Sequence, residues 1–259
     1  MKAMIFAAGL GTRLRPLTND RPKALVEVAG KPMLRRVIEN LIAYNFTDIT
    51  INVHHFGEKI IDFVAANDSF GVDIHISDER GMLLDTGGGI LKAREWLDGD
   101  EPFLVHNADI LTDLDLRAFY DYHCRHNADA TLLTKQRVTQ RYLLCDADSR
   151  LCGWINKSTG QVLPEGLEYR PDTFSEIAFG GVHVISPSIF PALEEYAATV
   201  ADSGSLHVNA GVKFSIIPFY VAMCRRLKIM SYAPEGYRWF DVGKPETLDV
   251  ANKAFGQCE

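Results

Sequence analysis

The chain has 259 residues, of which 47% are hydrophobic and 24% are charged, and its formal net charge is -7. This composition is typical of a globular protein with a substantial core, and it excludes a disordered or fibrous chain. The negative net charge argues against nucleic acid as a partner, because proteins that bind nucleic acid usually carry a broad basic face.

The five cysteines are scattered and show no CxxC spacing, so we expect reduced thiols and neither a disulfide framework nor a zinc site. The N-terminus has no cleavable signal pattern. The most apolar late segment, residues 214–223, is far shorter than the roughly 20 residues that a membrane span needs. We therefore expect a cytoplasmic protein without a membrane span; the sequence leaves the oligomeric state open.

The first half of the sequence alternates strands and helices. A short apolar run at residues 3–8 predicts a buried strand, and further strands are expected at 48–53, 72–77 and 102–107. Helical apolar spacing predicts intervening helices, one of which ends near Asn45 and another of which covers 116–126. This alternation predicts a parallel sheet whose ligands bind at the carboxyl ends of the strands.

The second half begins with shorter strands, expected at 130–134, 142–145 and 151–155, followed by a surface excursion over 158–173. A strand at 175–185 is interrupted by Gly180 and Gly181, which predict a bulge or a close approach by a ligand. Helices at 187–196 and 214–227 and a strand at 228–233 complete the pattern. We expect a single domain over residues 1–259.

A glycine-containing loop, Gly9-Leu10-Gly11-Thr12-Arg13, follows the first strand. Glycine allows the backbone to approach a ligand closely. Residues 13–31 of this acidic chain contain only two anions but five cations, which are Arg13, Arg15, Arg21, Lys23 and Lys31. Backbone N–H groups together with arginine and lysine are the groups that bind a polyphosphate.

The two common nucleotide motifs do not fit this loop. The dinucleotide fingerprint requires a third glycine, but position 14 is leucine, and the next strand leads into Asn52 and His54 rather than an acid. The P-loop ending GK[ST] is also absent. A plain turn is the remaining alternative, although the loop is unusually cationic for one. An NAD-binding oxidoreductase is therefore disfavoured.

Two later segments suggest ligand contacts. Three glycines, at 87–89, predict a flexible loop leading into a helix, where a flat base would lie against the backbone, although glycine runs also mark simple mobility. Asp109 follows the strand at 102–107, where a carboxylate would hold Mg²⁺ against a triphosphate. Nearby Asp113 and Asp115 are interpreted as loop and helix-capping residues. His54 and His55 are expected to pack in a loop.

The C-terminal segment Trp239-Phe240-Asp241-Val242-Gly243-Lys244-Pro245 predicts a strand, an acid, a tight turn and a helix. A capping role is the simpler interpretation of Asp241.

The stretch GLGTRLRPLTNDRPKALVEVAGKP closely resembles the N-terminal signature of the sugar-1-phosphate nucleotidyltransferases. LDTGGGI is similar to the segment of that family that lies along the nucleobase and ribose, and WFDVG to its second metal motif. The resemblance spans nearly the whole chain. It implies a single-domain, Rossmann-like α/β fold with a mixed, mostly parallel central sheet, helices on both faces and a small β-rich lobe. Residues 1–130 would form the nucleotide-binding half and 131–259 the sugar-phosphate-binding half.

The resemblance also implies roles for individual residues. Arg13 and Lys23 would be catalytic, and Asp109 and Asp241 would hold Mg²⁺. The nucleotide would contact Ala8, Gly9, Gly11, Thr12, Glu79, Gly87 and Gly88, and the sugar would contact Asn156, Lys157, Gly180 and Gly181. Three positions depart from the family pattern: Ala108 replaces a glycine, Asp85 stands where glutamate or glycine is common, and Asn156-Lys157-Ser158 replaces Glu-Lys-Pro.

The implied reaction joins a nucleoside triphosphate and a sugar 1-phosphate to give a nucleotide-sugar and pyrophosphate, as in cell-envelope precursor synthesis. Within the family, the chain most resembles N-acetylmuramate 1-phosphate uridylyltransferases. GTP-using mannose- or heptose-1-phosphate guanylyltransferases and phosphocholine cytidylyltransferases are the alternatives. A nucleotide-sensing regulatory subunit would lack the two metal acids, which are present here.

Overall fold

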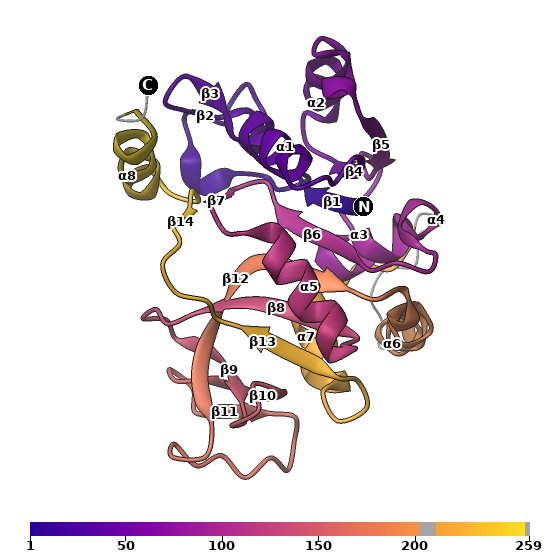
Figure 1. The fold of residues 1–259 in the computed structure, drawn as a ribbon, viewed down its shortest axis with the longest axis vertical. Coiled ribbons are helices and arrows are strands. Elements are labelled where there is room, and N and C mark those ends of the chain that lie inside the picture. Colours follow the sequence, from indigo (N-terminus) through magenta and orange to yellow (C-terminus); the bar gives the residue numbers. More distant parts are fainter. Residues whose placement is uncertain (203–210, 257–259) are drawn as a thin grey trace.

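The computed structural model, which describes residues 1–202 and 211–256, is built around a central sheet with the strand order β5-β4-β1-β6-β12-β8-β13 (Figure 1). Only β12 (Ser175–Ile185) runs against the other strands of this order, since it pairs antiparallel with both of its neighbours. The other strands are β1 (Lys2–Phe6), β4 (Asp48–Val53), β5 (Asp73–Asp78), β6 (Phe103–Asn107), β8 (Ala130–Lys135) and β13 (Ile229–Tyr232). The expected fold class, mixed and mostly parallel, is confirmed.

A small antiparallel lobe extends from the beginning of β12, in the lower part of Figure 1. It consists of β9 (Arg141–Cys145), β10 (Leu151–Asn156) and β11 (Gln161–Leu163). The expected β-rich lobe is therefore present, and the surface excursion at 158–173 contributes a short strand to it.

Helices cover both faces of the sheet. Side chains alternate in direction along each strand, so each face of the sheet has its own set of apolar side chains to bury. In β1, Ala3 and Ile5 belong to one buried core and Met4 belongs to the other. The first core includes residues of α1 (Met33–Ala43), α2 (Gly57–Ala65), α5 (Leu116–His126) and α8 (Pro245–Gly256). The second includes residues of α3 (Asp85–Lys92), α4 (Arg94–Leu97), α6 (Phe190–Asp202) and α7 (Ile216–Met223).

Short elements connect these layers. Three short strands were not predicted from the sequence: β2 (Glu27–Val28), β3 (Lys31–Pro32) and β7 (Ile110–Thr112). β7 pairs with β14 (Trp239–Asp241), more than a hundred residues away in the sequence. The 3-10 helices are η1 (Thr12–Leu14), η2 (Lys23–Leu25), η3 (Asp68–Gly71) and η4 (Pro187–Ile189). No described helix has the length and apolarity to cross a bilayer. Four cysteines are free thiols, and Cys258 lies outside the described residues.

The prediction of a flexible glycine loop is wrong, because Gly87, Gly88 and Gly89 all lie within α3. A Cβ at Gly87 would lie 2.3 Å from the Phe214 ring, and one at Gly88 would lie 2.2 Å from the carbonyl oxygen of Val212. The glycines therefore allow close packing of the helix. The predicted helix at 214–227 begins only at Ile216, because the Phe214 carbonyl accepts hydrogen bonds from the N–H groups of Gly87 and Gly88.

Three buried histidines make the fold sensitive to acid. Burial lowers the pKa of His106 and of His123 to about 4 and that of His183 to about 3. The unfolded chain binds protons at these groups near pH 6.5, whereas the folded chain does not. Stability from these groups is therefore present above that pH and is lost as pH falls toward the folded values.

We expect the free energy of unfolding to fall between pH 6.5 and 5, by about 1.4 kcal/mol per pH unit for each histidine once pH is well below 6.5. Urea titrations at several pH values measure this slope. His123→Gln is expected to reduce the slope, whereas His55→Gln, at an exposed position, leaves it unchanged. A stability that stays flat over this range contradicts the prediction.

Candidate active site

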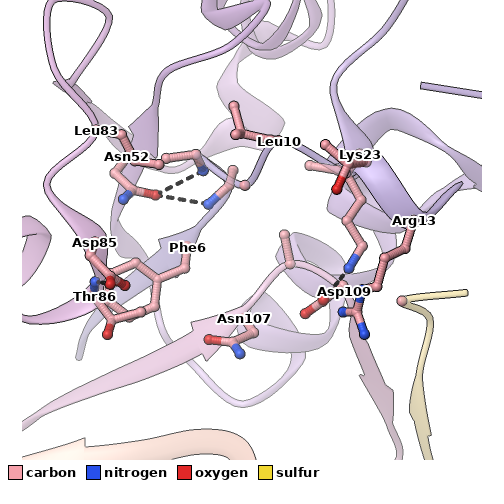
Figure 2. Close-up of a pocket in the computed structure, with 18 residues that line it drawn as sticks. Phe6, Leu10, Arg13, Lys23, Asn52, Leu83, Asp85, Thr86, Asn107 and Asp109 are labelled. Atoms are coloured by element: carbon pink, nitrogen blue, oxygen red, sulfur yellow. Dashed lines mark hydrogen bonds and ion pairs between the residues drawn. The ribbon is translucent and has the colours of Figure 1, made fainter. Parts of the chain in front are cut away.

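The carboxyl ends of the central strands meet at one cavity of about 400 Å³. Phe6, the last residue of β1, lies in register with Asn52 of β4 and Asn107 of β6, and all three line the cavity. Figure 2 shows cationic Arg13 and Lys23 toward one end and Leu83, Asp85 and Thr86 toward the other. The cavity has the volume of a small-molecule site and two chemically different ends.

The glycine loop forms the wall between these ends, with Ala8, Gly9, Gly11 and Thr12 in the cavity lining. Gly11 adopts a left-handed conformation with φ 63°, and a Cβ there would lie 2.9 Å from Cβ of Lys23. Within the described part of the chain, the N–H groups of Gly9, Leu10 and Gly11 have no recorded acceptor. Free N–H groups beside cations suit an anionic ligand.

Asn52 holds the start of this loop in place through hydrogen bonds. Its side-chain oxygen accepts from the N–H groups of Ala7 at 2.8 Å and Ala8 at 3.3 Å, and its amide nitrogen donates to Glu79 at 2.8 Å. The other Glu79 oxygen accepts from the N–H of Leu84 at 2.9 Å. This network joins the glycine loop to the segment before α3. Sequence reasoning missed Asn52; the available signal was an amide at the carboxyl end of an apolar parallel strand.

The network places Glu79 behind the cavity wall. Its side chain is buried, and burial raises the pKa of its carboxyl group. Both oxygens are hydrogen-bonded within the protein, so the structure does not bring Glu79 to the cavity as a base-edge acceptor. Gly87 and Gly88 are buried within α3 and do not line the cavity, and this end of the cavity is formed by Leu83, Asp85 and Thr86.

At the cationic end, Lys23 donates to a carboxylate oxygen of Asp109 (Figure 2). The side chain of Lys23 is 12% exposed and that of Asp109 is 23% exposed, so the pair is only partly screened by water. η2 places the lysine, and the end of β6 places the aspartate. A sequence-predicted catalytic cation and a sequence-predicted metal ligand are thus in direct contact.

Asp241 is brought beside Asp109 by the pairing of β14 with β7. Asp241 lies opposite Ile110, and the N–H of Val242 donates to the Asp109 carbonyl at 2.9 Å. A Cβ at Gly243 would lie 2.8 Å from both Asp241 Oδ1 and Arg13 Nη2, so this acid and this arginine both lie directly against Gly243. Gly243, which also lines the cavity, was not predicted as a site residue.

The donor set at this edge fits Mg²⁺ bound to a nucleotide. The described residues contain no cluster of three or more histidine, cysteine or acidic ligands. Mg²⁺ in phosphate-transfer sites usually takes one or two carboxylates and completes its shell with phosphate oxygens and water. Asp109, in the turn before β7, and Asp241, at the end of β14, supply that number of hard oxygen ligands.

The residues predicted to bind the sugar fall into two groups. In β12, Gly181 has φ 78°, and a Cβ there would lie 3.1 Å from Nδ2 of Asn107, so this bulge lies against the cavity lining. The Gly180 carbonyl accepts from the indole N–H of Trp239 at 2.8 Å.

The second group lies in the lobe and makes contacts of its own. Lys157 pairs with Glu176 and donates to the Tyr169 hydroxyl at 3.0 Å, and Asn156 accepts from the N–H of Ser158. Neither Asn156 nor Lys157 lines the cavity.

Asp113 and Asp115, which the sequence predicted to be loop and helix-capping residues, have structural roles. Asp115 accepts from the N–H of Ala118 at 2.8 Å and caps α5, and Asp113 pairs with Arg238 at 2.7 Å. His54 contacts the Glu79 carbonyl through Nδ1, and His55 packs on Phe56. These residues hold the loops in place and leave the cavity to the groups described above.

This fold and cavity define a nucleotidyltransferase: the chain belongs to the nucleotidyl transferase family, whose model matches residues 2–257. It is 33% identical to N-acetylmuramate alpha-1-phosphate uridylyltransferase of Caulobacter vibrioides over 99% of this chain and 97% of the relative. It is 29% identical to mannose-1-phosphate guanyltransferase of Schizosaccharomyces pombe over 95% of this chain and 62% of the relative. The family recognition made from the sequence is confirmed.

Among solved structures, a UDP-glucose pyrophosphorylase in complex with UDP-glucose superposes with a TM-score of 0.73 at 19% identity, covering 100% of this chain and 100% of that chain. This likeness establishes the shared fold. The family is one of enzymes.

Proposed function

We propose that this enzyme transfers a nucleoside monophosphate from a nucleoside triphosphate to a sugar 1-phosphate, releasing pyrophosphate. The observation that carries the proposal is the convergence of the glycine loop, Arg13 and the Lys23–Asp109 pair on one cavity. Residues 1–130 would bind the nucleotide and 131–259 the sugar phosphate. The base would occupy the end lined by Leu83, Asp85 and Thr86, and the phosphates would lie toward Arg13.

The reaction is an in-line displacement at the α-phosphorus. An oxygen of the sugar phosphate forms the new bond as the bond to pyrophosphate breaks, and the pyrophosphate takes the electron pair. Two anionic groups must approach each other, so positioning and charge neutralisation supply most of the catalysis. Arg13 would stabilise the departing pyrophosphate, and Lys23 would hold the α-phosphate and the attacking phosphate together.

Asp109 and Asp241 would hold Mg²⁺, which supplies charge neutralisation at the α-phosphate when bound. In the protein alone, Lys23 is bound to Asp109. Lys23 would exchange this carboxylate for phosphate oxygens when the nucleotide arrives. The pair therefore holds the lysine at the end of the cavity where the phosphates would lie. Nucleoside triphosphates are supplied in the cytoplasm, so the proposed reaction would take place there.

Among substrates, we favour UTP and N-acetylmuramate 1-phosphate, a precursor of the bacterial cell envelope. The support is the relative from Caulobacter vibrioides, which this chain matches along almost its full length. GTP with mannose 1-phosphate is the second candidate, supported by the yeast relative, of which this chain covers 62%. Gly180 and Gly181 would contact the sugar, with Asn156 and Lys157 at the lobe.

A matrix of four nucleoside triphosphates against several sugar 1-phosphates tests the proposal, with products identified by mass. We expect pyrophosphate only when both substrates and Mg²⁺ are present, because pyrophosphate leaves only as the sugar phosphate attacks. Hydrolysis of the triphosphate alone, with no nucleotide-sugar in any well, would overturn the proposed function. Phosphocholine belongs in the matrix as a non-sugar acceptor.

A further inference from the structure

A second cavity, of about 460 Å³, adjoins the first. Arg13 lines both cavities. Gly243 lines the first, and its near neighbours Asp241 and Lys244 line the second. The two cavities therefore meet at the Arg13–Asp241 edge, where the proposed function places the reacting phosphates.

The second cavity is cationic. Arg13, Arg137 and Lys244 line it, and Asp241 is the carboxylate among its lining residues. None of the ion pairs in the described parts of the chain includes Arg137 or Lys244, so no carboxylate of those parts neutralises either charge at the cavity. Such cations in a chain of net charge -7 indicate an anionic ligand.

Trp239 gives this cavity a fixed wall. Its ring lies 5.4 Å from Lys135 Nζ and 5.7 Å from Arg137 Cζ, so two cations contact the indole. Its N–H is bonded to the Gly180 carbonyl at 2.8 Å, next to the glycine bulge proposed to contact the sugar. Arg137, although exposed, is therefore supported at the wall of the cavity.

We propose that this second cavity recognises a carboxylate on the acceptor sugar, with Arg137 as its main partner and Lys244 as the second. The inference rests on the proposed function and names the class of acceptor: a sugar 1-phosphate with an additional acidic group. An acceptor phosphate on the Asp241 side of this edge would leave its sugar within reach of the second cavity, which Asp241, Lys244 and Arg137 line. N-acetylmuramate 1-phosphate has such a group, the carboxylate of its lactyl ether, and N-acetylglucosamine 1-phosphate is the same sugar without it.

Acceptor kinetics test this assignment with those two sugar phosphates and the lactyl carboxamide analogue. We expect the parent enzyme to prefer the carboxylate over both neutral acceptors in kcat/KM by about 10- to 100-fold, the range of a charge-assisted hydrogen bond. Arg137→Gln should remove most of this preference by raising KM for the acid, leaving the neutral acceptors within about twofold of the parent. Arg141→Gln, which removes an exposed arginine outside both cavities, serves as the control.

Calorimetry of the same acceptors with the same variants provides a readout that does not need turnover. Weaker binding of the acid alone in Arg137→Gln supports the inference. Equal losses of affinity for the acid and for the neutral acceptors overturn the inference. An increase in KM that is confined to the nucleotide also overturns it. If the protein forms nucleotide-sugars without preferring the acid, this inference fails and the proposed function stands. If no nucleotide-sugar forms with any acceptor, the proposed function fails, and acceptor binding still decides the role of Arg137.

Discussion

We expect Arg13→Ala to lower kcat and kcat/KM together, each by about 10²- to 10³-fold. The side chain lies in the lining of both cavities, close enough to Gly243 that a Cβ there would be 2.8 Å from its Nη2. Its charge is matched to the negative charge that grows on pyrophosphate as the bond to the α-phosphorus breaks. An interaction made mainly in the transition state changes both constants equally.

Arg15→Ala is the matched control, since Arg15 is exposed in the same loop and lines neither cavity. It should retain nearly full turnover. Steady-state kinetics with varied nucleoside triphosphate separate the two roles open to Arg13. A variant whose KM rises while kcat stays constant would show that Arg13 binds the ground state, and the transition-state role would be wrong.

Much of the fold was predictable because it depends on local patterns. The strand expected at 48–53 is found with the same bounds, since Ile49, Ile51 and Val53 alternate with polar residues, the period of a strand. The convergence of the glycine loop with Asp109 follows from parallel strands ending at one edge. Motif order alone, however, did not indicate that Lys23 binds Asp109 in the protein alone.

The errors come from contacts between distant residues. Gly87 is helical because the Phe214 ring and carbonyl lie against it, and nothing near position 87 in the sequence indicates that contact. Glu79 was predicted to face a base, but Asn52 and the N–H of Leu84 bind its carboxylate behind the cavity. The second cavity depends on Arg137 meeting Trp239, a hundred residues later in the chain. Such contacts follow from the order of strands in the sheet, which local periodicity does not specify.

We expect Asp109→Asn and Asp241→Asn each to lower turnover by about 10²-fold or more, because each removes a negatively charged ligand for the Mg²⁺ that would neutralise the reacting phosphates, while keeping the size of the side chain. Asp241→Asn is the cleaner variant. No hydrogen bond of the Asp241 carboxylate is recorded in the described residues, whereas Asp109 also holds Lys23. Magnesium titrations should show a higher Mg²⁺ requirement in both variants, and a chelator should stop the parent enzyme until Mg²⁺ is restored.

The competing interpretation makes Asp241 a helix cap, whose loss would cost about 0.5–2 kcal/mol of stability and leave the magnesium response unchanged. The structure argues against it, because α8 begins at Pro245 and its first turn is closed by Thr247, whose hydroxyl accepts from the N–H of Lys244 at 3.2 Å. Melting curves recorded beside the magnesium titrations separate the two. Because two acids that bind one cation act as a unit, the turnover of the double variant should be only slightly lower than that of the less active single variant. A destabilised Asp241→Asn with normal turnover and a normal magnesium response would show that the two acids do not share a cation.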